Sequence, residues 1–419
     1  MVGLIAGTGL LGGLVGAGYL ALLHVVERVL GPSRWGDWSH LAILVVVGLA
    51  VAVLSRVLGT PGDVELLVDN IHVQGGDDDI RRLRSLIPIS LLCVGAGGPL
   101  GPEAPLVTTT GSLGSWLARR VGVSRDDLRV VSITGMAAGF TVLFGAPLGS
   151  ALFALEILHR RGLEYYEALL PAVVGSLCGY GVSALLTHTG LGPMWHLPAP
   201  VALHAADLGL AVAAGAAGAL VAAAFSYLTS GLRLIARRIP LDGRPAIGGV
   251  ILGGLAMLTP YALTNGEMQI DHLTATRVAV GTLLLAAAVK LLSCAVALVT
   301  GWRGGFIIPL FFVGFCLGRA TEGHLPGGAS SWALAAALMV ACNVGVTKTP
   351  LGSTLVVTEM AGMTLLPTAL IAAVVSLVLT SGVGLIDTQR RRIDPETPDE
   401  SPQPDRTALA TDGAMRAAG

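Results

Sequence analysis

The sequence predicts an all-α polytopic membrane protein built from two inverted-topology repeats of tilted and broken transmembrane helices. Three observations support this prediction. The 419 residues are 53% hydrophobic and 13% charged, whereas a typical soluble domain has about 25% charged residues. Two motifs recur at nearly the same offset along the chain, and several apolar segments are interrupted by glycine and proline. The mean hydropathy of +0.74 agrees with a chain that lies mainly in lipid.

The repeat is visible in two pairs of motifs. Residues 101–105 (Gly-Pro-Glu-Ala-Pro) share a Gly-x-x-x-Pro frame with residues 305–309, and 305 − 101 is 204. Residues 147–156 match residues 350–359 at six of ten positions, and 350 − 147 is 203. Duplicated halves with broken segments at corresponding places are typical of transporters whose site lies between the halves.

Apolar segments of two lengths follow one another along the chain. A full membrane crossing needs about 20 residues, and the long segments lie at residues 2–26, 41–54, 208–232, 278–299 and 365–386. The shorter ones lie at residues 86–98, 106–117, 146–158, 306–317 and 351–363. We expect these to be tilted, re-entrant or half-crossing helices, which are tolerated where protein or a polar cavity surrounds the broken backbone.

These segments predict one transmembrane domain over residues 1–386. Repeat one is expected at about 1–186 and repeat two at about 205–386. The polar residues 387–419 are expected to form a disordered tail, too short for a regulatory domain. Because no Lys or Arg precedes Arg28, the first apolar segment is expected to be a retained membrane helix and not a cleaved signal.

The distribution of arginine predicts the orientation in the membrane. Basic residues concentrate at 160–161, 233–244 and 390–392. The excess of Lys and Arg in cytoplasmic loops of membrane proteins places these loops and the C-terminus in the cytoplasm. We therefore expect a multi-pass protein of the plasma (inner) membrane.

Composition argues against several functions. The net charge of −1 gives no basic surface for nucleic acid, and the five cysteines lie in apolar segments without metal-type spacing. No metal and no cofactor are expected. An intramembrane enzyme would need a Ser–His or Asp–Asp pair facing a cavity, and the spans offer almost no histidine. A purely structural role does not account for internal symmetry around broken helices.

Glu103 is the main candidate for a functional residue. An ionisable side chain at membrane depth is costly and marks a functional site by default. It lies between two prolines beside a glycine-rich stretch. Glycine allows a close backbone approach, proline can start a helix, and helix N-termini bind anions through free N–H groups. Two such N-termini, one from each repeat, would form an anion site.

Four motifs together resemble the CLC family of chloride channels and proton/chloride exchangers, in a divergent bacterial-type form without CBS domains. Residues 101–105 are similar to that family's Gly-Arg/Lys-Glu-Gly-Pro, and residues 302–309 to its Gly-Gly-x-Phe-x-Pro. Residues 144–156 resemble its Phe-Asn-Ala-Pro-Leu…Phe-x-x-Glu helix, and residues 348–360 its Arg-x-Pro-Leu…Glu-Met helix. The resemblance extends over roughly residues 3–390.

The resemblance implies a homodimer in the lipid bilayer with one anion pathway in each subunit. It assigns Glu103 as the gate, whose carboxylate occupies an anion site when ionised and swings away when protonated. The anion-binding candidates are Thr60, Gly101, Ala104, Gly305, Phe306 and Ile307. Thr60 is expected on the cytoplasmic side of the site, in place of the family's inner serine.

Two departures from the family pattern bear on proton coupling. Ile157 stands where the family's exchangers usually carry a second glutamate, and Ile386 falls near the place of a late tyrosine. The neighbouring Glu156 is a candidate for a proton path. The predicted function is transport of chloride or a similar small anion, channel-like or weakly proton-coupled. Proton/chloride or proton/fluoride exchange is the alternative.

Overall fold

The computed structural model describes residues 1–62, 68–69, 71–72, 80–159, 165–187, 195, 197–198, 200, 202–326, 328–386 and 389. Within these residues every regular element is a helix, and the one β-type pairing is an isolated bridge between Gly101 and Gly305. Six helices are long and apolar enough to cross a membrane. The predicted all-α membrane architecture is therefore confirmed, whereas the predicted tail lies outside the described residues except for Gln389.

The helices fall into two sets in the same order. The first set is α1 (Val2–Leu30), α2 (Asp37–Leu58), α4 (Leu83–Gly95), α5 (Glu103–Val121), α6 (Arg125–Phe144), α7 (Pro147–Glu156) and α8 (Leu169–Thr187). The second set is α9 (Ala205–Ala236), α10 (Arg244–Leu258), α11 (Glu267–Ala275), α12 (Val280–Val299), α13 (Ile307–Arg319), α14 (Ser331–Thr347), α15 (Pro350–Ala361) and α16 (Leu366–Leu379).

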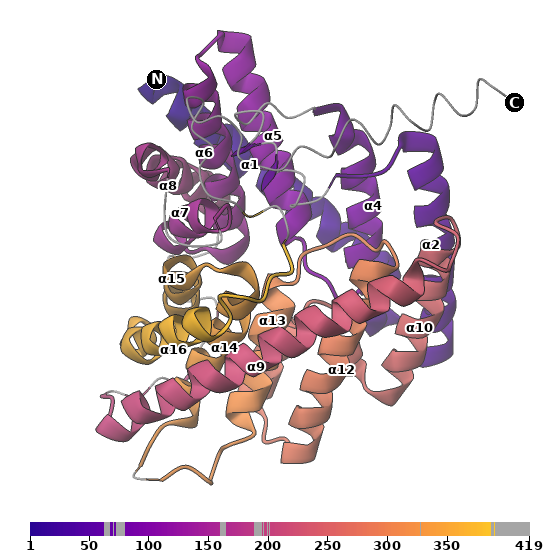
Figure 1. Cartoon of the computed structure of the whole chain (residues 1–419). Coiled ribbons are helices and arrows are strands. Elements are labelled where there is room, and N and C mark those ends of the chain that lie inside the picture. Colours follow the sequence, from indigo (N-terminus) through magenta and orange to yellow (C-terminus); the bar gives the residue numbers. More distant parts are fainter. Residues whose placement is uncertain are drawn as a thin grey trace, which may run out of the picture.

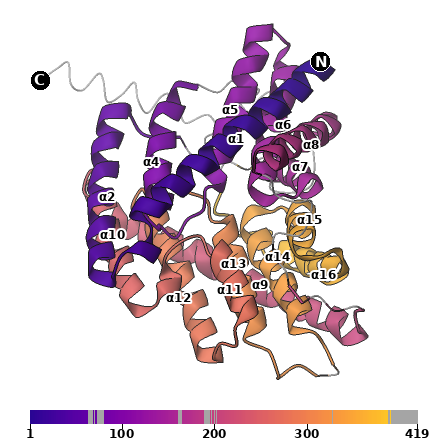
Figure 2. The ribbon, with the colours of Figure 1, turned by 180° about the vertical axis from the view of Figure 1, so that it is seen from behind.

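The two sets pack in the same way. Helix α1 contacts α6 and α8, and its counterpart α9 contacts α14 and α16. The hairpin of α5 and α6 matches that of α13 and α14, while α2 packs on α10 and α7 on α15 across the boundary between the sets. Helix α9 crosses the near face obliquely in Figure 1, and α1 crosses the opposite face in Figure 2. This arrangement agrees with two inverted repeats.

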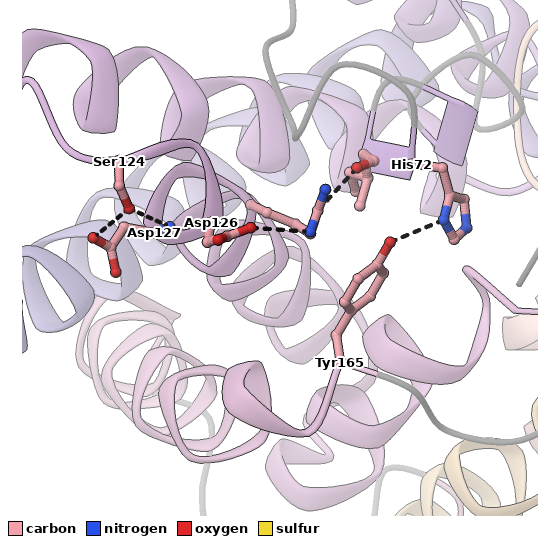
Figure 3. A network of polar contacts seen from close by, with 7 residues as sticks. His72, Ser124, Asp126, Asp127 and Tyr165 are labelled. Atoms are coloured by element: carbon pink, nitrogen blue, oxygen red, sulfur yellow. Dashed lines mark hydrogen bonds and ion pairs between the residues drawn. The ribbon is translucent and has the colours of Figure 1, made fainter. Parts of the chain in front are cut away.

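Corresponding helices begin with the same local chemistry. Pro147 and Pro350 stand at the first turns of α7 and α15, where a missing N–H costs nothing. Ser124 caps α6 by accepting a bond from the Asp127 N–H (Figure 3), and Ser330 caps α14 in the same way from the Ala333 N–H. The two copies of each sequence motif thus correspond to helices that begin in the same way.

The predicted short helices are present near the middle of the molecule. Helix α7 has 10 residues and α15 has 12. At about 1.5 Å per residue each is some 15–18 Å long, about half of a 30 Å hydrocarbon core. Helix α7 packs against α6, and α15 packs against α14; both α6 and α14 are almost completely buried. Each short helix is therefore covered by protein along one side, whereas Leu148 and Leu351 in their first turns are 50% and 44% exposed.

Candidate functional site

The starts of α5 and α13 are joined by a two-residue backbone bridge. The Gly101 N–H donates to the Gly305 carbonyl at 2.8 Å, and the Gly305 N–H donates to the Gly101 carbonyl at 2.6 Å. A Cβ atom on either glycine would collide with the Glu103 carboxylate. The glycines of both motifs are therefore needed for the two helix starts to meet around that side chain.

The Glu103 carboxylate lies at the N-terminus of α13. Its Oε1 accepts a hydrogen bond of 2.6 Å from the Ile308 N–H in the first turn of that helix. Its Oε2 is buried and has no hydrogen-bond partner among the described residues, and the whole side chain is inaccessible to solvent. A carboxylate of the first repeat thus occupies the anion-binding end of a helix of the second repeat.

A cavity of about 130 Å³ begins beside this carboxylate. Its lining residues are Gly62, Leu86, Ala104, Pro105, Phe140, Ile157, Arg233, Leu298, Trp302, Arg303, Gly304, Gly305, Phe306, Ile307, Leu385 and Ile386. The predicted residues Ala104, Gly305, Phe306 and Ile307 therefore line one space next to Glu103. Gly101 lies in the backbone bridge at the edge of this site.

Thr60 does not belong to this group. Its side chain is exposed and is not among the residues that line the cavity, whereas Gly62, two residues later, does line it. Ile157 and Ile386, which stand where the family resemblance expects a glutamate and a tyrosine, are both in the wall. The cavity wall is therefore apolar at both of these positions.

Glu156 points to another helix end. Its carboxylate accepts bonds from the Leu351 N–H at 3.1 Å and the Gly352 N–H at 2.7 Å, so it caps the start of α15. The arrangement is reciprocal, because Glu359 near the end of α15 accepts a bond of 3.3 Å from the Gly149 N–H of α7. Glu156 is not among the residues that line the cavity.

Sequence reasoning missed two arginines in the cavity wall. Arg233 lies near the end of α9 and Arg303 lies just before the second glycine motif. Guanidinium groups carry a positive charge at all physiological pH values, so both bring a positive charge to the cavity wall. The position of Arg303 beside Gly304 and Gly305 was the available signal.

Comparison with known proteins shows which family the sequence of this chain matches. The family described as voltage gated chloride channel matches residues 64–381. A chloride/fluoride channel protein of Pseudomonas syringae pv. tomato is 29% identical over 412 residues, covering 93% of this chain and 85% of that protein. A voltage-gated ClC-type chloride channel ClcB of Salmonella typhimurium is 30% identical over 302 residues, covering 70% of this chain and 71% of that protein.

Solved structures have the same fold. A CLC-type fluoride/proton antiporter superposes with a TM-score of 0.79 at 23% identity, covering 92% of this chain and 96% of that one. A slow cyanobacterial Cl⁻/H⁺ antiporter superposes with a TM-score of 0.78 at 18% identity, covering 90% and 93%. The two-repeat helical architecture is therefore shared with proteins of known three-dimensional structure.

Proposed function

Since this chain belongs to the family of voltage gated chloride channels, we propose that it conducts chloride or a similar small anion through a pathway gated by Glu103. Anion transport across a membrane is the activity of this family. The assignment of Glu103 as the gate rests on the hydrogen bond from the Ile308 N–H to the Glu103 carboxylate. An ionised carboxylate at this helix end competes with an anion for the same N–H groups and dipole.

Protonation of Glu103 opens the pathway in this proposal. The neutral carboxyl group loses its attraction to the start of α13, so an anion displaces it and meets the backbone of Phe306 and Ile307. The positive charges of Arg233 and Arg303 favour entry of the anion from the cavity. Gly101, Ala104 and Gly305 shape the passage around the carboxylate, and Thr60 remains a candidate ligand at its cytoplasmic mouth.

We propose channel-like or weakly proton-coupled flux. Ile157 and Ile386 line the cavity, and neither side chain can carry a proton. Glu156 is engaged at the start of α15, so a role in a proton path would require it to leave that position. Proton-coupled exchange is the alternative, because two proteins with this fold are named as antiporters of an anion and a proton.

The arginine-bearing loops are proposed to face the cytoplasm of the plasma (inner) membrane. Arg56 at the end of α2 pairs with Asp242 between α9 and α10, and Arg84 donates to the Leu58 carbonyl. These contacts gather the ends of α2 and α9 and the start of α4 on one side, which is rich in arginine. The positive-inside rule assigns that side to the cytoplasm, and the C-terminus with it.

A second copy of the chain is the proposed partner. The exposed side chains of α8 and α16 are large and apolar, and both helices lie on one side of the molecule in Figure 1. The exposed residues are Leu170, Val174, Leu177, Leu185 and Leu186 of α8 and Val374, Val378 and Leu379 of α16. A homodimer through this face leaves one complete anion pathway in each subunit.

Flux from proteoliposomes tests the proposed function. The purified chain is reconstituted in vesicles loaded with chloride or with fluoride, and anion release and internal pH are recorded together. Anion release well above that of empty vesicles is expected, with little proton movement. Absence of release for both anions contradicts the proposal, and uphill proton movement at a fixed ratio to the anion supports exchange instead.

A further inference from the structure

A buried lysine of α12 lies beside α13, the helix on which the Glu103 carboxylate rests. Lys290 is inaccessible to solvent, and it is not among the residues that line the cavity. By the offset of 204 it corresponds to Leu86 of the first repeat, which does line the cavity. A charged side chain at membrane depth is costly and marks a functional position by default. The proposed anion pathway gives this lysine no role, so its contacts were followed outward.

The lysine holds the short connection that precedes α11. Its Nζ donates to the Leu263 and Thr264 carbonyls, each at 2.7 Å, and to the Gln269 Oε1 at 3.3 Å. These bonds compensate the buried ammonium group for its lost hydration. Thr264 has a φ of 57°, which is uncommon for a β-branched residue. Such a conformation persists only where the surroundings impose it, and the lysine supplies that constraint.

The same connection binds the segment that leads from α4 to Glu103. The Thr264 N–H donates to the Gly97 carbonyl at 2.9 Å. Cys294 lies one turn after the lysine on the same face of α12, and its Sγ donates to the Pro99 carbonyl at 3.4 Å. One face of α12 therefore supports this segment twice, directly through the cysteine and indirectly through the lysine and the connection that it holds.

The connection also contacts the helix that receives the carboxylate. A Cβ on Gly266 would lie 2.6 Å from the Phe312 Cβ, and the Lys290 Nζ lies 5.0 Å from the centre of the Phe312 ring. Phe312 follows Ile308 by one turn, so the two lie on the same face of α13. Because the Ile308 N–H donates to Glu103, the connection touches both the helix that donates this bond and the segment that precedes its acceptor.

We propose that Lys290 is a positioning residue for the gate, because it fixes the connection at residues 263–266 between α13 and the segment before Glu103. The inference rests on the proposed function, in which Glu103 closes the pathway. Without the lysine the connection loses its charged donor, and Thr264 leaves the left-handed conformation. The carboxylate is then held less firmly at the Ile308 N–H, so an anion displaces it at a higher pH than in wild type.

The test replaces the lysine and leaves the titratable groups near it and near Glu103 in place. Among the described residues those groups are Tyr19, Glu267, Cys294 and Cys316. Lys290→Met removes the charged donor and keeps an unbranched side chain. The matched control is Lys348→Met, because Lys348 is also buried in the second repeat and also donates to two backbone carbonyls.

Two further variants act on the connection itself. Gly266→Ala keeps the lysine but pushes the connection away from Phe312. Thr264→Gly, made together with Lys290→Met, allows the left-handed backbone to persist without strain. Each variant is made alone and together with Glu103→Gln and is reconstituted in proteoliposomes loaded with chloride. Anion release is then measured from about pH 5 to 8.

Lys290→Met and Gly266→Ala should each move the midpoint of the pH profile upward by about one unit, which corresponds to about tenfold more flux than wild type at alkaline pH. Lys348→Met should keep the wild-type midpoint. Thr264→Gly should bring the midpoint of Lys290→Met back toward that of wild type. In the presence of Glu103→Gln none of the variants should alter the flux, because the gate is already released.

A wild-type midpoint in Lys290→Met overturns the inference, and Gly266→Ala decides the question in the same way if the lysine variant does not fold. An equal shift in Lys348→Met also overturns it, as does a failure of Thr264→Gly to restore the midpoint, which would assign the effect to charge. Altered flux in the presence of Glu103→Gln overturns it by placing the effect outside the gate. Wild-type flux without any response to pH overturns it but leaves anion transport standing; no anion flux at all defeats the proposed function itself.

Discussion

The starts of α5 and α13 occupy equivalent places in the two repeats but bring different chemistry. With the offset of 204, Glu103 corresponds to Ile307. The first repeat supplies a carboxylate and the second supplies the helix N-terminus on which that carboxylate lies. Two glutamates here would repel each other, and two isoleucines would leave no titratable gate. The duplicated backbone therefore brings two helix starts together, and in the proposed function the carboxylate of the first repeat makes the pathway responsive to protons.

The ends of α6 and α14 differ in a second way. Gly145 and Lys348 both have left-handed backbone conformation, with φ of 63° and 61°. This conformation costs a residue with a Cβ about 1–2 kcal/mol. Lys348 offsets the cost, because its buried Nζ donates to the Gly345 carbonyl at 2.6 Å and to the Thr380 carbonyl and hydroxyl at 2.7 and 2.8 Å. Among the described residues, this lysine joins the end of α14 to the end of α16 in the second repeat.

The largest effect is expected from Glu103→Gln, which removes the main difference between the two helix starts. The amide side chain has no negative charge for the N-terminus of α13 to attract, and it cannot ionise. We therefore expect the pathway to stay open at every pH. Anion flux should persist and lose its pH dependence, as measured in proteoliposomes between pH 5 and 8, the range over which most proteins keep their stability. A pH profile like that of wild type contradicts the assignment of the gate.

The sequence predicts the repeats, the broken helices and the position of Glu103, because both motifs carry the same offset and mark helix starts. It does not predict that Ile308 donates to the carboxylate, since that depends on the rotation of α13 about its axis. The burial of His72 and His159 also escapes it, because both lie in short segments without helical periodicity. Thr60 matches the expected hydroxyl in position along the chain, yet its side chain is exposed.

The crossing of α7 and α15 relies on one glycine from each repeat. A Cβ at Gly352 would lie 2.5 Å from the Phe153 Cα and 2.6 Å from its N, and neither backbone atom can move alone. Gly352→Val should therefore lower stability by about 3 kcal/mol, the upper part of the usual range for overpacking. Thermal unfolding in detergent measures this. The control Gly254→Val lies where a Cβ meets open space and should unfold near wild type.

Lys348→Met removes the link that distinguishes the second repeat but leaves the left-handed backbone in place. Three buried hydrogen-bond acceptors lose their charged donor, which should cost about 2 kcal/mol. Lys348→Gly makes this helix end like that of the first repeat and relieves the backbone strain, so it should unfold at a higher temperature than Lys348→Met. The reverse order of the two melting temperatures would show that the left-handed backbone at this position costs little.

The smallest effect is expected from the two glutamates that cap α7 and α15, because there the repeats are nearly alike. Glu156 accepts two N–H bonds and Glu359 is given one longer bond of 3.3 Å. Glu156 is buried, whereas Glu359 is partly exposed. A glutamine keeps an accepting oxygen but loses the charge, so Glu156→Gln should lower the free energy of unfolding by about 1 kcal/mol and Glu359→Gln by less.

The stability of both variants is measured by thermal unfolding, and proton movement is recorded in the same preparations. An equal cost for the two would mean that the helix ends are equivalent, and loss of proton movement in Glu156→Gln alone would assign this carboxylate to the proton path.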